Sequence, residues 1–479
     1  MMKKLPLVLE RLIKIFFWWL LLQFFLQTFV TYKLGWADGI WNVIWLWKEI
    51  FILIFLWCVG FWIYDRIKKE EKEKIFSRFH STEVFRFLIT FLAACGLTFL
   101  LAVGIQKVGL WTYILSFKYD LLAFLIFLLG IGLVWLFPLE HIKFHKRYQK
   151  ILKFVIWGGF IWWGIIFLIP NSLRHFGYSA RNFEGSLGTN PPAVYYSQIN
   201  QGFTRNQFLF ERPLGLWFFL TAFRPLFALM YLRFRSRKEQ IRWTLGFWIL
   251  TFSTLSRAAL GVWLLQTAIL ALIIYRKQAK KLIFYIWIPS FIVLLAGLWH
   301  FRGIFTREHS NTGHLVLLEE GIKIWMQNPF FWRWAGYSGP ASHQLCFRSE
   351  DNPRCKLIKE INQKYEISTY GYNPENQYVQ IFMEYGFIGL LPRLFCFLWL
   401  TWVGLKTIKP LLLEMKKGKK ADQKIINQLA LLCAFGLGMF GLALEGFVLH
   451  SFVDRMIVYP FILLYGLSYG SVNKEQNSA

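Results

Sequence analysis

The segment Tyr372–Leu391, YNPENQYVQIFMEYGFIGLL, decides how this chain can fold. It opens with polar residues and with Pro374, whose fixed φ suits the turn before a helix. It then becomes apolar enough to cross a bilayer, yet polar side chains recur at helical spacing: Asn376, Gln377, Gln380 and Glu384. Lipid does not tolerate such a stripe, so we expect it to face protein or a water-filled cavity, with Glu375 at the mouth.

The composition of the whole chain indicates a membrane protein. Of the 479 residues, 56% are hydrophobic and only 17% are charged, whereas soluble domains carry about 25% charged residues. Continuous apolar runs of about 20 residues predict α-helical spans and not the short alternating segments of a β-barrel. The formal charge of +27 resides mostly in short loops between these runs, as the positive-inside rule predicts, and we expect no nucleic-acid partner.

Basic loops alternate with loops of low charge along the chain. This alternation predicts an all-α polytopic protein with about twelve spans in a cell (plasma or inner) membrane, and with both termini in the cytoplasm. The N-terminal apolar run is expected to be a retained first span. The expected spans are 13–31, 48–64, 84–104, 119–137, 151–170, 214–232, 241–255, 257–275, 282–300, 377–405, 427–449 and 455–471.

Three parts are expected along the chain. Residues 1–300 hold the first nine spans and an outer loop, 171–213. Residues 301–375 form a large extracytoplasmic loop with an amphipathic helix, and residues 376–479 hold the last three spans and a short cytoplasmic tail. Loops as long as these two usually carry function or a small subdomain.

The amphipathic helix lies within His309–Asn328, where apolar residues recur at helical spacing: Leu315, Leu318, Ile322, Trp325 and Met326. Its N-terminus offers free N–H groups beside His314. This corner is either a phosphate site or a solvated basic patch.

Ile241–Tyr275 is flanked on both sides by basic clusters, so both of its ends should be cytoplasmic. One continuous helix would be about 50 Å long, against a hydrocarbon core of about 30 Å. We therefore expect a hairpin whose turn, Ser253–Arg257, lies slightly below the outer surface. Arg257 either binds an anion there, or snorkels to the interface or pairs with a carboxylate.

Other outer-loop residues are candidates for binding. Ala335–His343 combines glycines with Ser338 and His343, which suits close approach to a ligand or a simple turn. Arg205 is a second candidate anion contact, and Cys346 and Cys355 either form a disulfide outside the cytoplasm or remain thiols. The chain has no CxxC pair, no clear metal-ligand spacing and no Gly-rich phosphate loop, so we expect neither a metal site nor ATP use.

Together these pieces resemble the O-antigen ligase and O-antigen polymerase superfamily over about Asn200–Glu384. The family often has His where this chain has Glu375, and Arg where it has His314. The resemblance rests on Ser256-Arg257, on Arg205 followed by Pro213-Leu214-Gly215, on Thr312-Gly313-His314 through Asn328-Pro329 and Gly336, and on Glu375-Asn376 followed by Val379, Glu384, Gly386 and Gly389.

The resemblance implies a fold similar to the GT-C glycosyltransferases. It implies an inverting enzyme that moves a glycan from a polyprenyl-diphosphate-linked oligosaccharide to a glycan, lipid or protein acceptor at the outer face of the membrane, without metal, nucleotide or other cofactor. In this scheme Arg257, Arg205 and His314 bind the diphosphate. Glu375 is the catalytic base, and the acceptor lies near Asn376, Ser338 and His343.

Two other readings stand beside the enzyme. The first is a transporter of lipid-linked sugars or another polar solute. Transporters usually show inverted repeats, and the sequence lacks such symmetry, while its long one-sided loops favour an enzyme. The second is a catalytically inactive membrane scaffold.

Overall fold

The computed structural model describes residues 8–16, 47–68, 83–105, 107–136, 141–169, 179–182, 193–195, 205–210, 212–232, 235–275, 315–319, 321–323, 376–418, 422–448 and 455–476, with a few isolated positions. Its helices are α3 (Trp47–Lys68), α5 (Glu83–Phe99), the π-helix η2 (Leu100–Ile105), α6 (Leu110–Asp120), α7 (Leu122–Leu136), α8 (His141–Leu168), α9 (Pro213–Met230), α10 (Arg237–Ser253), α11 (Arg257–Ile274), α18 (Gln377–Leu405), α19 (Ile408–Lys416), α20 (Gln423–Glu445) and α21 (Arg455–Gln476).

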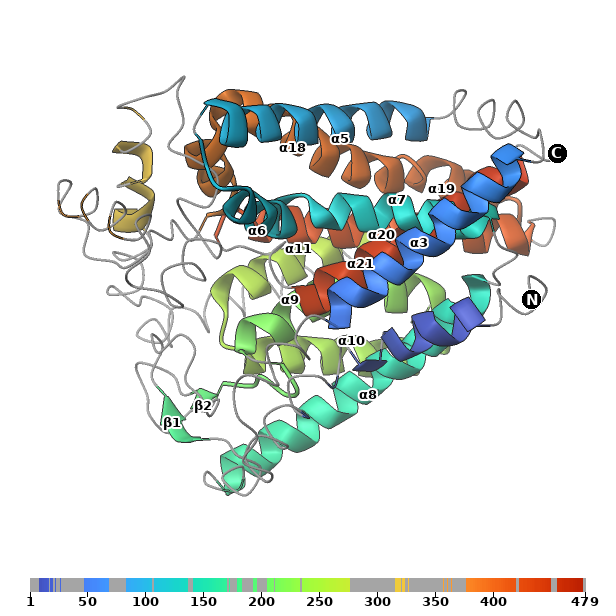
Figure 1. Ribbon diagram of the computed structural model, residues 1–479. Coiled ribbons are helices and arrows are strands. Elements are labelled where there is room, and N and C mark those ends of the chain that lie inside the picture. Colours follow the sequence, from blue (N-terminus) through green and yellow to red (C-terminus); the bar gives the residue numbers. More distant parts are fainter. Residues whose placement is uncertain are drawn as a thin grey trace.

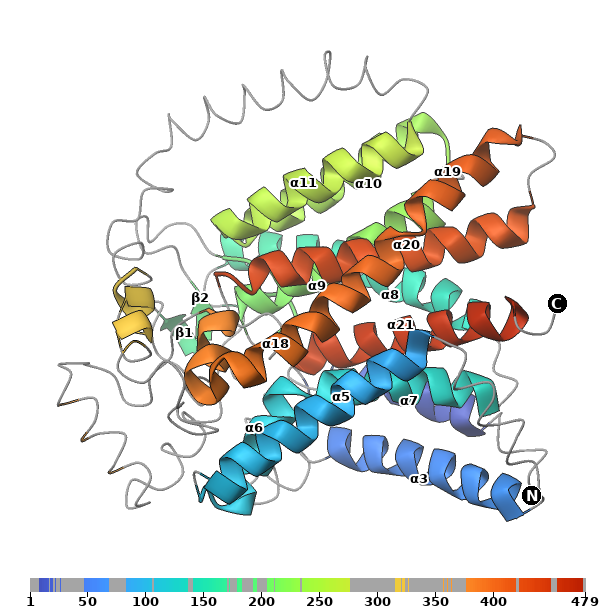
Figure 2. The same ribbon diagram turned by 90° about the horizontal axis from the view of Figure 1, so that it is seen from above.

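The long helices lie side by side in one bundle (Figures 1 and 2). Two short strands, β1 (Ser179–Asn182) and β2 (Ala193–Tyr195), pair in parallel within the expected outer loop 171–213. They lie at the left end of the bundle in Figure 1, whereas α21 ends on the right. Apart from this small ribbon, the regular structure of the described residues is helical.

Six described segments are long and apolar enough to cross a membrane, or seven if α6 and α7, bent by 64° with respect to each other, form one span. The chain is therefore a helical, multi-pass membrane protein, as its composition predicts. Helices also occupy the expected spans 48–64, 241–255 and 455–471, while 13–31 and 282–300 fall largely outside the described residues. The total of twelve spans and the cytoplasmic position of the termini stay predictions.

Glycines let the helices pack closely. A Cβ built on Gly466 of α21 would lie 2.2 Å from the carbonyl oxygen of Phe127 in α7. A Cβ on Gly404 of α18 would lie 2.3 Å from the Cα of Gly436 in α20. Any side chain at these positions would push the backbones apart. Small residues are needed here because the hydrophobic effect does not drive apolar helices together within lipid.

The hairpin expected over 241–275 is confirmed. Helices α10 and α11 are joined by the turn 254–256. The hydroxyl of Tyr275, just past the end of α11, donates to the side-chain carbonyl of Gln240 near the start of α10, so the two helices run antiparallel. Within the turn, Leu255 has a φ of 52°, a left-handed conformation that is strained for a residue with a branched side chain.

The sequence predicts one continuous span over 377–405, but the structure breaks it. Gly386 has φ 60° and ψ −163°, a conformation that interrupts the helix and that glycine adopts without a steric penalty. We call residues 377–385 the outer half-helix of α18 and residues 387–405 the inner half-helix. Across the break, Tyr385 of the outer half-helix contacts Arg393 of the inner half-helix.

Candidate functional site at the outer end of the bundle

Helices α9, α11 and α18 begin at the same end of the bundle, and α20 ends there (Figures 1 and 2). The hydroxyl of Thr221, in α9, donates to the Oε1 atom of Glu445, the last residue of α20, at 2.5 Å. The backbone N–H of Gln377 donates to the carbonyl oxygen of Gly446 at 2.9 Å. We call this the outer end, because the sequence predicts that it faces the exterior.

Arg205 lies against the turn of the α10–α11 hairpin. Its Nε donates to the carbonyl oxygen of Thr254 at 2.9 Å, and the backbone N–H of Asn206 donates to the carbonyl oxygen of Ser253 at 2.8 Å. The side-chain amide of Asn206 donates to Ser253 Oγ at 3.0 Å and to the carbonyl oxygen of Gly159 at 3.0 Å. Helices end with unpaired carbonyls, and this segment supplies donors to the last carbonyls of α10.

Arg257 is the first residue of α11 and is half-buried. Ser256 precedes it at the N-cap position but makes no side-chain hydrogen bond to the helix N–H groups. The positive end of the α11 dipole and the guanidinium therefore lie together, a combination that favours an anion. Through Thr254, the same turn binds Arg205. The structure thus brings the two predicted arginines onto segments that contact each other.

Asn376 has a clear structural role at the start of the outer half-helix. Its Oδ1 accepts from the backbone N–H groups of Tyr378 and Val379, both at 3.0 Å, and its Nδ2 donates to the carbonyl oxygen of Phe447 at 2.8 Å. The hydroxyl of Tyr378 also donates to the carbonyl oxygen of Ala443 at 2.8 Å. Asn376, predicted to lie near the acceptor, is thus the N-cap that fastens α18 to the end of α20.

The polar stripe of the outer half-helix faces protein, as the sequence predicts. The exposed fractions are 8% for Asn376, 3% for Gln377, 1% for Gln380 and 0% for Glu384. Neither polar side-chain atom of Gln380 has a hydrogen-bond partner among the described residues. A buried amide without partners costs about 1–3 kcal/mol, so Gln380 is a position where a ligand hydroxyl would be stabilising.

A set of buried polar residues joins α9, α11 and α20 beneath the outer end. Arg224 donates through Nη2 to Gln266 Oε1 at 3.1 Å, and Gln266 Nε2 donates to the carbonyl oxygens of Thr221 at 3.1 Å and Leu437 at 2.9 Å. Glu445, which accepts from Thr221, is fully buried. The sequence analysis did not single out this set, although an arginine inside the expected span 214–232 was a signal for it.

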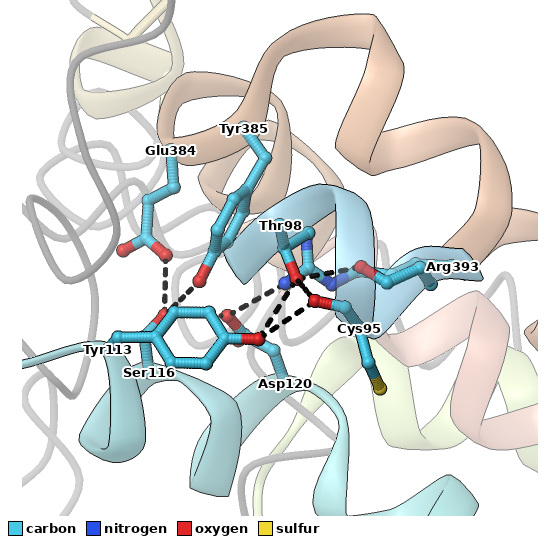
Figure 3. A network of polar contacts seen from close by, with 9 residues as sticks. Cys95, Thr98, Tyr113, Ser116, Asp120, Glu384, Tyr385 and Arg393 are labelled. Carbon is cyan, nitrogen blue, oxygen red and sulfur yellow. Dashed lines mark hydrogen bonds and ion pairs between the residues drawn. The ribbon is translucent and has the colours of Figure 1, made fainter. Parts of the chain in front are cut away.

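A second buried network surrounds the break in α18 (Figure 3). Ser116 Oγ lies 3.0 Å from Asp120 Oδ2, 3.2 Å from Glu384 Oε2 and 2.5 Å from Tyr385 Oη. Nη2 of Arg393 lies 3.6 Å from Asp120 Oδ2, and its guanidinium carbon lies 3.8 Å from the centre of the Tyr385 ring. This network links α6 to both halves of α18. Charged residues inside two expected spans, Asp120 and Arg393, were again the available signal.

Several predicted site residues lie outside the described residues: Glu375, His314, Ser338, His343, Cys346 and Cys355. Among the residues that are described, no group of three His, Cys, Asp or Glu side chains could hold a metal ion. The cysteines expected inside spans are free thiols; Cys58, Cys396 and Cys433 are buried and Cys95 is partly so.

Part of the expected amphipathic helix is described. Residues 315–319 and 321–323 are helical. Of its apolar face, Leu315 and Met326 are each 65% exposed and Ile322 is 40% exposed. Beside this face, Lys323 Nζ lies 2.7 Å from Glu319 Oε1, and this hydrogen bond lowers the pKa of the Glu319 carboxyl. An exposed apolar face beside an exposed ion pair suits a helix that lies on a membrane surface.

The fold and these contacts define a class: a multi-pass helical membrane protein whose outer end gathers arginines and buried carboxyl groups. Residues 243–392 match the family described as O-antigen ligase. The match supports the resemblance to the O-antigen ligase and polymerase superfamily that the sequence motifs predict, and the family suggests a membrane protein that transfers glycans. No curated protein matches the chain.

Proposed function

We propose that the protein is a membrane glycosyltransferase that moves a glycan from a polyprenyl-diphosphate carrier to an acceptor hydroxyl at the outer face of the cell membrane. It would serve as a polymerase or ligase of O-antigen or another surface polysaccharide. One observation carries the proposal. The segment that matches the O-antigen ligases, 243–392, supplies both the turn that bears Arg257 and the half-helix that follows Glu375.

The diphosphate is proposed to bind at the start of α11. Arg257 is the first residue of that helix, and Arg205 lies on the segment bonded to the preceding turn. Guanidinium groups form strong, charge-assisted hydrogen bonds with phosphate oxygens, and the helix dipole adds to their effect. Charge develops on the diphosphate as it leaves, so fixed cations in a poorly hydrated site lower the barrier. His314 is proposed to assist from the start of the amphipathic helix.

Glu375 is proposed as the base, one residue before the N-cap Asn376. Its carboxylate takes the proton of the acceptor hydroxyl. The hydroxyl oxygen then forms a bond to the anomeric carbon, and the bond from that carbon to the diphosphate oxygen breaks with the electron pair going to the diphosphate. Attack opposite the leaving group inverts the anomeric centre. The charges that develop are met by protein groups, so the scheme requires neither metal nor cofactor.

The glycan is proposed to contact amide and hydroxyl groups near the mouth. The buried amide of Gln380 lies one turn below Asn376, and both of its polar atoms lack partners among the described residues. An amide can donate to one sugar hydroxyl and accept from another. Ser338 and His343 of the large outer loop are proposed to complete the acceptor side.

Incubation of the purified protein in lipid nanodiscs with a polyprenyl-diphosphate oligosaccharide tests the proposal. A ladder of longer glycans indicates a polymerase, and a single transfer to an added acceptor indicates a ligase; either result supports the proposal. If the intact lipid-linked sugar instead moves across a liposome membrane and no new glycosidic bond forms, the protein is a transporter and the proposed enzyme function is wrong.

A further inference from the structure

The outer half-helix of α18 is short and is separated from the rest of its span. It covers residues 377–385 and ends at Gly386, whose backbone conformation is not helical. A helix of this length is only marginally stable by itself, so its position depends on its contacts with the rest of the protein. At the outer end it is bonded to α20, through Gln377 and Asn376.

At its inner end the half-helix meets α6. Glu384 and Tyr385 are its last two residues, and both contact the hydroxyl of Ser116, at 3.2 Å and 2.5 Å. Asp120, one turn along α6, accepts from the same hydroxyl at 3.0 Å. A single small side chain, that of Ser116, therefore contacts both terminal residues of the half-helix and the carboxylate of Asp120.

Arg393 joins the inner half-helix to the same place. Its guanidinium stacks on the ring of Tyr385, at 3.8 Å from the ring centre, and lies 3.6 Å from the Asp120 carboxylate. Figure 3 shows side chains from both halves of α18 meeting those of α6. The contact thus spans the break. It joins Tyr385 before Gly386, Arg393 after it and Asp120 of the neighbouring helix α6.

This arrangement of buried charges contributes little to the folding stability of the protein. Arg393 is fully buried, and its three side-chain nitrogens have no hydrogen-bond partner among the described residues. Buried ion pairs of imperfect geometry often stabilise a protein less than apolar side chains of similar volume would. Such a pair can instead select one arrangement of the elements that carry it, because every other arrangement leaves a buried charge unpaired.

We propose that Ser116, Asp120 and Arg393 form a latch that fixes the angle of the outer half-helix across the Gly386 break. The latch is a set of positioning residues: it sets where the start of α18, and with it Glu375, stands relative to Arg257. This inference rests on the proposed function, since the position of Glu375 matters only if it acts on a substrate. Displacement of a reacting group by about 1 Å can lower a rate by about a hundredfold.

The test uses full-length protein in nanodiscs and two readouts. Hydrogen exchange compares the amides of residues 377–385 with those of 387–405, and steady-state kinetics separate kcat from KM. The variants are Ser116→Ala, the conservative Ser116→Thr, and the double variant Asp120→Asn/Arg393→Gln. The double variant removes both charges together and avoids leaving one buried charge alone. Thr401→Val is the control, because among the described residues that hydroxyl bonds only to the carbonyl oxygen of Phe397 in its own helix, at 3.0 Å.

We expect Ser116→Ala and the double variant to speed exchange in the outer half-helix by about tenfold or more, with the inner half-helix and Thr401→Val unchanged. We expect kcat to fall by about ten- to a hundredfold with little change in KM, and Ser116→Thr to restore most of it. Unchanged exchange in the outer half-helix overturns the latch. Faster exchange with wild-type kcat overturns its role in positioning. If the wild-type protein itself transfers no glycan, the proposed function fails, while the exchange data still decide the latch.

Discussion

Arg205 donates through Nε to the carbonyl oxygen of Thr254 at 2.9 Å, across 49 positions of sequence. This hydrogen bond satisfies one of the otherwise unpaired carbonyl groups at the end of α10. It also holds the segment before α9 against the turn before α11. Two arginines proposed to bind one diphosphate therefore lie on segments that are bonded to each other. The position of either arginine therefore depends on the position of the other.

Arg205→Ala should lower both stability and glycan transfer. It removes a buried, charge-assisted hydrogen bond, so the free energy of unfolding should fall by about 1–3 kcal/mol, and the turn that carries Arg257 should loosen. Thermal unfolding and transfer assays measure the two effects. Arg235→Ala is the control, because that side chain is 44% exposed and contacts Glu239, at 3.7 Å, and the ring of Tyr231, at 4.5 Å from the ring centre. Wild-type transfer by Arg205→Ala would remove Arg205 from the site.

Arg257→Ala should abolish transfer while leaving membrane insertion and folding intact. Loss of a group that stabilises charge in the transition state lowers kcat by about a hundred- to a thousandfold. Arg257→Lys should recover part of the activity, since it keeps the charge but not the planar fork. Arg237→Ala offers a close match, because Arg237 is the first residue of α10 as Arg257 is of α11. Equal losses in both variants would show that the effect is not specific to the outer end.

Glu375→Gln should abolish transfer because an amide cannot take up the acceptor proton at neutral pH. Glu375→His should retain activity, since imidazole is a competent base and the family often has histidine at this position. In that variant the acid limb of the pH–rate profile should move to higher pH, because imidazole binds its proton more tightly than a carboxylate does. An unshifted profile in an active Glu375→His variant would mean that another group is the base.

Asn376→Ala should destabilise the start of α18 by about 1 kcal/mol through loss of the N-cap. The same change also removes the hydrogen bond to Phe447, so Asn376→Ser, which keeps a capping oxygen but is too short to reach Phe447, should lie between alanine and the wild type. Thermal unfolding of the three proteins in the same detergent gives the order. If alanine unfolds at the wild-type temperature, the observed hydrogen bonds contribute nothing measurable.

Much of the scaffold could be predicted from the sequence because lipid imposes strict rules. A segment with basic flanks on both sides must return to the side where it began, which gave the α10–α11 hairpin and its turn next to Arg257. A polar stripe on an apolar helix must be buried in protein, and the exposed fraction of Glu384 is indeed 0%. The expected carboxylate–arginine site itself stays a prediction, since Glu375 lies outside the described residues.

The long-range contacts could not be predicted. Nothing in the sequence distinguishes Gly386, with its positive φ, from a glycine inside a regular helix. The sequence therefore suggested one span where the structure has two half-helices. The contact of Ser116 with Glu384 joins residues 268 positions apart, and no periodicity in either segment encodes it. Asn376 matched a family motif, yet its hydrogen bond to the carbonyl oxygen of Phe447 joins residues that only the folded chain brings together.

The backbones of α7 and α21 touch so closely at Gly466 and Phe127 that a single added carbon would collide, at 2.2 Å, with a carbonyl oxygen. No isoprenoid or acyl chain fits through such a seam. A carrier whose sugar is processed at the outer end must keep its hydrocarbon tail along a different flank of the bundle. This pair of helices is therefore a tightly closed part of the bundle interior.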